Sequence, residues 1–273
     1  MPDDPAQFVL RFERVTVEFD GYKALDHMSF EVAPGESLVL FGAAGSGKTV
    51  LLKTALGLQK AEAGRVSVFG RDITDLPERE LFGIRREMGV LFQEGGLFDS
   101  LTIEENVSYP LANLAGFHCT PEEMHARAEE ALRFVELEHT LEKFPSELSG
   151  GMRRRVGIAR AVVTEPPLVL YDSPTAGLDP ITAYTIVALI LKQRDLRNTT
   201  TVMATHRYQD GHFLANSWFN PATGEIEHNG KREGGSRTTF MVLQEGRLVF
   251  SGSLAELKAS QDPYVSKFVK RED

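Results

Sequence analysis

The fold of this chain is decided by the stretch Gly42-Ala43-Ala44-Gly45-Ser46-Gly47-Lys48-Thr49. An apolar run at 37–41 precedes it and another at 50–56 follows it, which predicts a strand, a glycine-rich turn and a helix. Glycines allow successive backbone N–H groups to point at one anion, and the positive end of the helix dipole lies at the same place. We expect Lys48 to reach the β- and γ-phosphates of a nucleotide and Thr49 to offer its hydroxyl to Mg²⁺.

Composition limits the remaining possibilities. The 273 residues, of which 42% are hydrophobic, can fill the core of one large domain. Thirty Lys and Arg against 39 Asp and Glu give a net charge of −9, which argues against nucleic acid as a partner. The single cysteine, Cys119, excludes an internal disulfide and suits a reducing cytosol. We find no signal-peptide pattern and no apolar run near the roughly 18 residues that span a bilayer, so any membrane function requires a partner that crosses the membrane.

Alternating apolar residues at 8–19 and 28–32 predict strands of an antiparallel sheet that leads into the strand at 37–41. Phe19 is a candidate for stacking on an adenine ring, and Tyr22 is a weaker one. The alternative is that these aromatic residues belong to the ordinary core. Further short strands are expected at 64–70 and 88–92.

Three polar residues follow predicted strands. Gln93 ends the strand at 88–92 and precedes a glycine-rich loop at 94–99, so it is a candidate ligand of Mg²⁺ or of an attacking water. Asp172 ends the buried run 168–171, where a carboxylate can hold Mg²⁺ opposite Thr49. His206 ends a strand at 200–205 on the same side of the sheet. Each residue, taken alone, is also compatible with an ordinary surface or turn position.

A helical region is expected from 101 to 163. Thr120-Pro121-Glu122-Glu123 forms a capping box that starts one helix. A second helix runs from Met152 to about Thr164 after Ser149-Gly150-Gly151, whose small residues leave an N-terminus open to an anion. We interpret Arg153-Arg154-Arg155 as a solvated or ion-paired face rather than a phosphate site.

The remaining chain contains a predicted helix at 181–196, an inserted hairpin or flexible loop at 217–239, strands at 240–243 and 247–250, and a tail at 258–273.

Together these motifs resemble the nucleotide-binding subunit of ATP-binding cassette (ABC) transporters, over residues 8–257. Six elements carry the resemblance: Gly42 to Thr49 (Walker A), Gln93 (Q-loop), Leu148-Ser149-Gly150-Gly151-Met152 (signature), Leu168 to Asp172 (Walker B), Ala176 to Asp179 (D-loop) and His206 (switch histidine). The resemblance implies an α/β P-loop NTPase fold. Its RecA-like core would comprise 8–93 and 164–252, with an N-terminal antiparallel β-subdomain and an inserted helical subdomain, including the Q-loop, at 94–163.

The resemblance also implies ATP and Mg²⁺ as ligands, ATPase activity and a sandwich dimer. Gln93, Asp172 and His206 would be catalytic, and Thr49, Gln93 and Asp172 would bind the metal. The Walker A residues and Phe19 would bind one ATP, while Ser149, Gly150 and Gly151 would bind the ATP of the other copy and Asp179 would form a dimer contact. Partners would be a second copy or a different ATPase chain, and transmembrane permease subunits at the cytoplasmic face of the inner membrane.

Within the family the chain looks most similar to ATPases of the Mla and Mce type, which serve lipid transport across bacterial envelopes. The similarity lies in 92–102, 106–111 and 145–152, with Met152 where many relatives have Gln, and in the tail from Asp262 to Phe268. It implies transport of phospholipid or another lipid, with periplasmic lipid-binding subunits reached through the permease.

One residue departs from the family pattern. The family usually has a glutamate after the Walker B aspartate, and this chain has Ser173. A hydroxyl is a poor base near neutral pH, and general-base assistance is worth roughly 10²- to 10⁴-fold in rate. We expect a slow ATPase in which Gln93 and His206 position the water. The alternatives are a heterodimer whose other chain carries the glutamate, a nucleotide-gated regulatory subunit with little turnover, or a serine introduced to trap ATP.

A soluble ABC protein acting on ribosomes or DNA is a further alternative. Such proteins typically carry two cassettes or a long coiled-coil insertion, and the sequence has neither.

Overall fold

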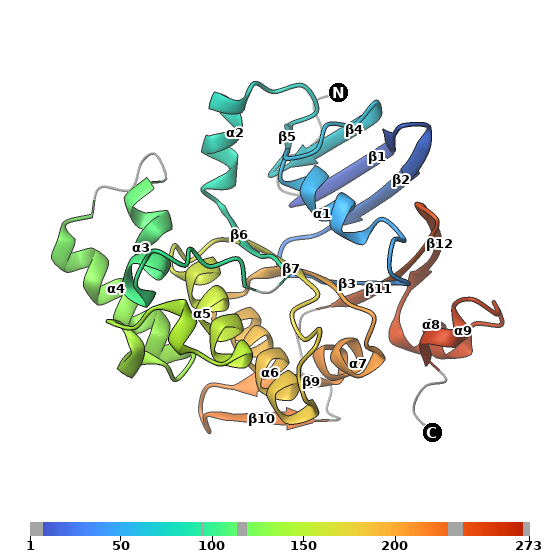
Figure 1. Cartoon of the computed structure of the whole chain (residues 1–273). Helices are drawn as coiled ribbons and strands as arrows, with labels where there is room; N and C mark the ends of the chain where they lie inside the picture. Colours follow the sequence, from blue (N-terminus) through green and yellow to red (C-terminus); the bar gives the residue numbers. More distant parts are fainter. Residues whose placement is uncertain (1–7, 94, 114–118, 229–236, 270–273) are drawn as a thin grey trace.

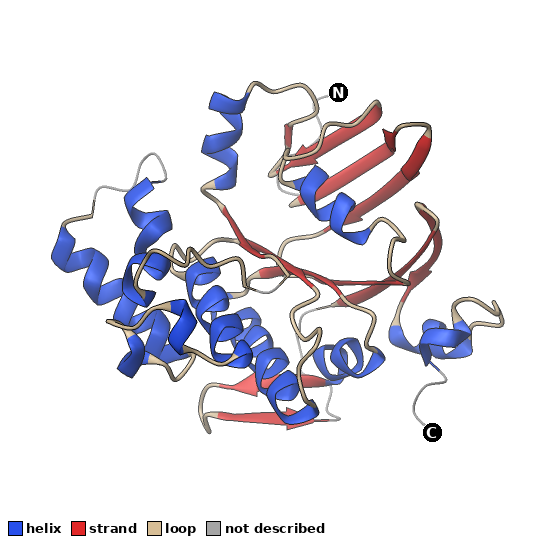
Figure 2. Ribbon diagram, in the orientation of Figure 1, coloured by secondary structure: helices blue, strands red, loops and turns tan. Residues whose placement is uncertain are grey.

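The computed structural model describes residues 8–93, 95–113, 119–228 and 237–269. A mainly parallel sheet lies at its centre (Figures 1 and 2). In the described part of the chain this sheet has six strands in the order β12-β11-β3-β8-β7-β6. The strands are β3 (Ser37–Gly42), β6 (Met88–Leu91), β7 (Leu168–Asp172), β8 (Thr200–Ala204), β11 (Thr238–Gln244) and β12 (Arg247–Gly252). Within this sheet β12 runs antiparallel to β11, and the other described pairings are parallel.

The central strands are apolar runs because both faces of the sheet are covered. Every residue of β3, β7 and β8 is buried. The carboxyl ends of these three strands lie side by side, as the registers Leu40↔Ala204 and Asp172↔Ala204 require. Ligands of parallel α/β sheets bind at this edge. The Walker A stretch begins at the end of β3, Asp172 is the last residue of β7, and His206 follows β8.

An antiparallel sheet covers one side of the molecule and contains β1 (Leu10–Phe19), β2 (Tyr22–Val32), β4 (Ala63–Val68) and β5 (Arg71–Asp72). Helix α1 (Lys48–Ala55) packs between it and the central sheet (Figure 1). Their common core includes Phe12, Leu40 and Leu52. The strand predicted at 28–32 is longer than expected and begins at Tyr22. Helix α2 (Glu78–Arg85), which the sequence pattern did not indicate, precedes β6.

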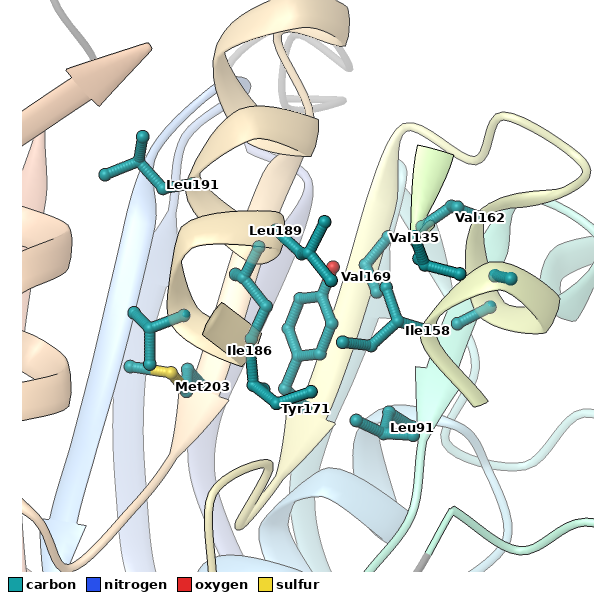
Figure 3. Close-up of a cluster of buried hydrophobic side chains, with 14 of the residues drawn as sticks. Leu91, Val135, Ile158, Val162, Val169, Tyr171, Ile186, Leu189, Leu191 and Met203 are labelled. Atoms are coloured by element: carbon teal, nitrogen blue, oxygen red, sulfur yellow. The ribbon is translucent and has the colours of Figure 1, made fainter. Parts of the chain in front are cut away.

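A group of helices lies on the other face of the central sheet, and the first two of the group pack on the third rather than on the strands. They are α3 (Ile103–Asn113), α4 (Pro121–Phe134), α5 (Gly150–Val162), α6 (Pro180–Arg197) and α7 (Tyr208–Asn216), with short 3-10 turns at Glu138–Thr140 and Pro145–Glu147. Figure 3 shows the core between α5, α6 and the strands, where Ile158 and Ile186 meet Tyr171. The predicted capping box of α4 is confirmed, because Thr120 and Glu123 each accept the other's backbone N–H. Helices α3 to α5 lie within the span 94–163, whose boundaries stay a prediction.

Strands β9 (Ser217–Asn220) and β10 (Glu225–His228) form a hairpin beside α6. Asp195 of α6 anchors the hairpin by accepting the N–H of Phe219 at 2.7 Å and pairing with Arg194 at 2.8 Å. The hairpin lies in the predicted insertion at 217–239, of which residues 229–236 fall outside the described residues. Helices α8 (Leu254–Ala259) and α9 (Ser266–Val269) follow β12, and the predicted tail continues beyond the described part of the chain. No helix that the structure describes is long and apolar enough to cross a membrane.

Candidate nucleotide site

The loop from Gly42 to Thr49 connects β3 to α1 as predicted. Gly47 has a φ of 103°, and a Cβ at this position would lie 2.4 Å from the carbonyl oxygen of Ala24. Only glycine fits such a contact, because the obstacle is a backbone atom. Gly47 also caps α1 without a side chain, so its first N–H groups receive no acceptor from the cap residue and remain suited to an anion.

Lys48 folds over this loop. Its Nζ donates to the carbonyl oxygens of Gly42 at 2.7 Å and Ala43 at 2.8 Å, and lies 3.3 Å from Ser46 Oγ. Burial lowers the pKa of Lys48, while the negative charge of Asp172 opposes that shift. The ammonium group is thus held at the loop by neutral oxygen atoms, and a phosphate would provide it with a stronger, charged acceptor.

Thr49 and Asp172 meet although they belong to different halves of the chain. Thr49 Oγ1 donates to Asp172 Oδ2 at 2.7 Å. A hydroxyl and a carboxylate are oxygen donors of the kind Mg²⁺ accepts, and this ion usually takes one or two protein ligands and completes its shell with phosphate and water. These two residues therefore fit the predicted metal role.

Ser173 occupies a constrained position directly after β7. Its φ is 52°, its N–H donates to Ala204 at 2.8 Å, and its hydroxyl donates to Asp172 Oδ1 at 3.1 Å. The hydroxyl proton is therefore directed at the carboxylate. This arrangement gives Ser173 no basic atom for activating a water molecule.

A cavity of about 960 Å³, here named the loop cavity, brings most of the predicted groups together. Gln93, Ser173 and His206 line it together with the loop. Its complete lining is Ala43, Ala44, Gly45, Lys48, Thr49, Gln93, Ser173, Ala176, His206, Arg207, Tyr208, Gln209, Tyr264, Lys267 and Phe268. Residues from five separate parts of the sequence thus face one space that is large enough for a nucleotide.

Ser149, Gly150 and Gly151 are not among the described residues that line the loop cavity. Ser149 is exposed and caps α5 by accepting the N–H of Met152 at 3.3 Å. Asp179 caps the neighbouring α6 by accepting the N–H groups of Ile181 and Thr182, and hydrogen bonds from Thr182 lower its pKa. These two helix starts face outward, so they can act on a nucleotide only if another molecule presents it.

The aromatic candidates lie at the tip of the β1–β2 hairpin, where Phe19 pairs with Tyr22. Phe19 is 44% exposed and Tyr22 is 54% exposed, so neither belongs to the core. The Tyr22 hydroxyl lies 3.4 Å from the carbonyl oxygen of Gly45. Adenine stacking by Phe19 stays a prediction, and Tyr22, not Phe19, is the residue whose hydroxyl approaches the loop.

The interpretation of Arg153, Arg154 and Arg155 as a solvated or ion-paired face was wrong for Arg154, while Arg153 and Arg155 are partly exposed. Arg154 is only 5% exposed and donates to the carbonyl oxygens of Ser173 at 2.9 Å and Pro174 at 2.7 Å. Arg153 and Arg155 donate to the carbonyl oxygens of Leu148 and Val135. A guanidinium group carries five N–H donors in a planar fork, which suits it to loops that expose several carbonyl groups.

Two groups of residues near the loop cavity were not among the functional residues predicted from the sequence. Asp210 of α7 is buried and accepts hydrogen bonds from Thr175 and Thr205, so it ties the loop after β7 to the strand that precedes His206. Tyr264 and Lys267 line the loop cavity from the C-terminal part of the chain. An acidic residue in a helix is common and gives no sequence signal. Tyr264 and Lys267 lie in the tail that carries part of the subfamily resemblance, but no local pattern there indicates nucleotide binding.

A family profile described as "ABC transporter" matches residues 25–176, which include the loop, Gln93, Ser149 and Asp172. The chain belongs to the ABC transporter family. The predicted α/β P-loop fold of this family is confirmed, and the roles assigned above to the Walker A, signature and switch residues stay predictions.

Relatives of this chain include ATP-binding proteins named for different transport substrates. It is 39% identical over 201 residues to "Methionine import ATP-binding protein MetN" of Rhizobium johnstonii, covering 74% of this chain and 55% of that protein. It is 35% identical over 204 residues to "Probable ribonucleotide transport ATP-binding protein mkl" of Mycobacterium leprae, covering 74% and 58%. The chain thus spans little more than half the length of these relatives.

Solved ABC cassettes share the fold over most of the chain. The ATP-binding cassette MJ0796, solved as a dimer in a post-hydrolysis state bound to ADP and phosphate, has a TM-score of 0.76 and 30% identity, with 90% of this chain and 98% of that chain covered. The protein cbiO1 of Clostridium perfringens, part of the ABC transporter complex cbiONQ, has a TM-score of 0.76 and 26% identity, with 93% and 92% covered.

Proposed function

We propose that this chain binds ATP between two copies and couples ATP binding and hydrolysis to transport by membrane partner subunits. The observation that carries the proposal is the division of the site. Lys48 and Thr49 face the loop cavity, whereas Ser149 lies outside it at an exposed helix start. A second copy can bring its Ser149 to the phosphates held at Lys48, so that ATP becomes part of the interface.

In this proposal each residue has a defined task. The Walker A N–H groups and Lys48 bind the phosphates, and Thr49 and Asp172 hold Mg²⁺, which neutralises charge on the phosphates when bound. Gln93 and His206 orient the attacking water, because the Ser173 hydroxyl already donates to Asp172. Hydrolysis is expected to be slow, since no carboxylate takes the place of the usual glutamate.

An apolar groove near Gln93 supports a membrane partner. It has a volume of about 350 Å³ and is lined by residues that include Phe92, Gly96, Phe98, Tyr109 and Pro110. Phe98 and Tyr109 are 43% and 40% exposed, and their rings lie 4.7 Å apart. Exposed apolar surface of this kind commonly marks a protein interface. A permease segment seated here would sense movement of the loop after Gln93. In this proposal the chain works at the cytoplasmic face of the inner membrane, held there by its permease.

Transport of phospholipid or another lipid is the finer part of the proposal. It is supported by the similarity of 92–102, 106–111 and 145–152 to Mla- and Mce-type ATPases. The relatives named above carry methionine or ribonucleotide in their names, so these are the competing cargoes. Proteoliposomes containing the chain and its permease should move labelled phospholipid only with MgATP. ATP-dependent uptake of methionine without lipid movement would contradict the lipid assignment.

The divided site is tested by mixing two variants. Lys48→Ala removes the phosphate contact of its own loop, and Ser149→Arg blocks the contact to the neighbour's phosphate. Each variant alone should remain monomeric with MgATP in light scattering, whereas the unmodified chain should dimerise. A mixture retains one intact composite site and should recover part of the dimer.

Ser146→Arg is the matched control, because Ser146 is an exposed serine in the turn before α5. This variant should dimerise like the unmodified chain. Dimerisation of Ser149→Arg to the same extent would contradict the proposed sandwich.

A second candidate function, favoured by Ser173, is a regulatory clamp that closes on ATP and turns it over very little. The clamp predicts an ATP-dependent dimer that persists for hours without phosphate release. Measured phosphate release above that of Lys48→Ala would contradict it.

A further inference from the structure

We propose that the C-terminal segment 262–269 is part of the nucleotide site, with Lys267 contacting the terminal phosphate and Tyr264 positioning the Walker A loop. The inference rests on the proposed binding of ATP at Lys48. It assigns binding roles to residues that lie outside the matched family region, 25–176.

The segment is held firmly against the phosphate-binding strand. Val265 is fully buried, and the ring of Phe268 stacks on Phe41 of β3 with centroids 5.9 Å apart. Phe268 also contacts Tyr264 edge to face at 5.3 Å. Because Phe41 directly precedes Gly42, this packing fixes the segment at the base of the Walker A loop.

Tyr264 forms a polar bridge from the segment to that loop. Its hydroxyl accepts the N–H of Ala43 at 3.3 Å and donates to the carbonyl oxygen of Leu243 at 3.2 Å. One hydroxyl can do both, so Tyr264 ties the first turn of the loop to the end of β11. Loss of the hydroxyl would leave the Ala43 N–H without this acceptor and loosen the start of the loop.

Lys267 contributes a positive charge to the same space. It lines the loop cavity together with Lys48, Gln93, Ser173 and His206, and its Nζ lies 5.9 Å from the centre of the Tyr264 ring. Gln93, Ser173 and His206 are the groups expected around the terminal phosphate. Lys267 is exposed and shares the cavity lining with these groups, and its positive charge would favour the triphosphate over the diphosphate, since ATP carries the extra negative charge.

The experiment measures the affinity of the full chain for MgATP and MgADP by titration calorimetry. Lys267→Gln should weaken MgATP binding about two- to fivefold, the range for one exposed ion pair, and should change MgADP binding less. The effect should shrink at high salt, because exposed charges are screened. Lys258→Gln, the same change at an exposed lysine of α8 outside the cavity lining, is the control and should leave both affinities unchanged. Lys267→Arg should restore MgATP binding.

Tyr264→Phe keeps the ring and removes only the hydroxyl. It should weaken binding of both nucleotides, because it acts through the loop. Unchanged nucleotide affinities in Lys267→Gln and Tyr264→Phe would overturn this inference but not the proposed function. Tighter ATP binding in either variant would do the same. An unmodified chain that binds no ATP would overturn the proposed function as well, so the two failures are distinct.

Discussion

Arg154 donates a hydrogen bond of 2.9 Å to the carbonyl oxygen of Ser173, and this contact joins the two halves of the proposed catalytic apparatus. Arg154 lies on α5, the helix that starts at Ser149, while Ser173 faces the loop cavity. In a sandwich dimer Ser149 would contact the ATP bound by the other copy, and Ser173 would face the ATP bound by its own copy. A displacement of α5 on closure would therefore move the loop after β7 in the same molecule.

Removal of this guanidinium should destabilise the protein. Arg154→Met keeps most of the side-chain volume but leaves the buried carbonyl oxygens of Ser173 and Pro174 without charged donors. We expect a loss of about 2–3 kcal/mol in the free energy of unfolding, measured by urea denaturation. Arg79→Gln, a change at a highly exposed arginine, should stay within about 0.5 kcal/mol of the unmodified chain. An equally small loss in Arg154→Met would show that the hydrogen bonds of Arg154 contribute little to the stability of the protein.

Ser173→Glu should raise the rate of ATP hydrolysis. A carboxylate at this position can accept a proton from the attacking water, and such assistance is worth roughly 10²- to 10⁴-fold. Steady-state phosphate release by Ser173→Glu, by the unmodified chain and by Lys48→Ala provides the comparison. If the unmodified chain releases no more phosphate than Lys48→Ala, it is not a slow ATPase. If Ser173→Glu is no faster than the unmodified chain, the missing base is not what limits the rate.

Asp210 should make stability depend on pH. Burial raises the pKa of Asp210, although hydrogen bonds from Thr175 and Thr205 and the positive charges of Arg207 and His206 oppose the shift. The folded chain then binds more protons than the unfolded chain between pH 3.8 and the raised pKa, so this residue's contribution to stability falls as pH rises through that window. Asp210→Asn removes the titration.

The test of this prediction compares urea unfolding of the unmodified chain and Asp210→Asn from pH 4.5 to 8. The stability of the unmodified chain relative to Asp210→Asn should be greatest at the acid end and decrease as pH rises. Other carboxyl groups titrate in both proteins and cancel in the difference. A difference that does not vary with pH, or one that increases with pH, would contradict the raised pKa.

The groove around Phe98 should be required for association with membrane subunits. Phe98→Glu places a charge on its apolar surface, which would have to be desolvated on docking. We expect at least a tenfold loss of permease recovered with tagged chain from detergent-solubilised membranes, with ATP binding unchanged. Val249→Glu, at another exposed apolar residue on β12, is the control and should retain the permease. Equal recovery of the permease with Phe98→Glu and Val249→Glu would show that the groove around Phe98 is not the interface.

The sequence predicted the parts of the fold that depend on local patterns. The buried strands, the glycine turn and the capping box at Thr120 are specified by residues close together in the chain, and all lie where expected. Helix α2 was missed, because its eight residues carry only two buried side chains, Leu81 and Ile84. A helix with so narrow an apolar face gives little periodic signal.

The sequence predicted residues that the structure brings to one cavity, among them Lys48, Gln93 and His206, but not the residues that hold their loops in place. Arg154 and Asp210 act through contacts with loops distant in sequence. Charged residues are usually solvated, and no local pattern distinguishes the buried ones. Tyr264 lies in the tail that carries part of the resemblance, but its contact with Ala43 could not be predicted, since the two residues are 221 positions apart.

The position of β3 in the central sheet determines when, during synthesis, the Walker A loop gains its support from neighbouring strands. Ser37 pairs with Thr201 on one side and Thr238 on the other, so the strand that presents the phosphate loop has no neighbours in the sheet until most of the chain has left the ribosome. Pairings of such long range form late and slowly. A nascent chain should therefore acquire affinity for ATP only after β11 has been synthesised and has paired with β3.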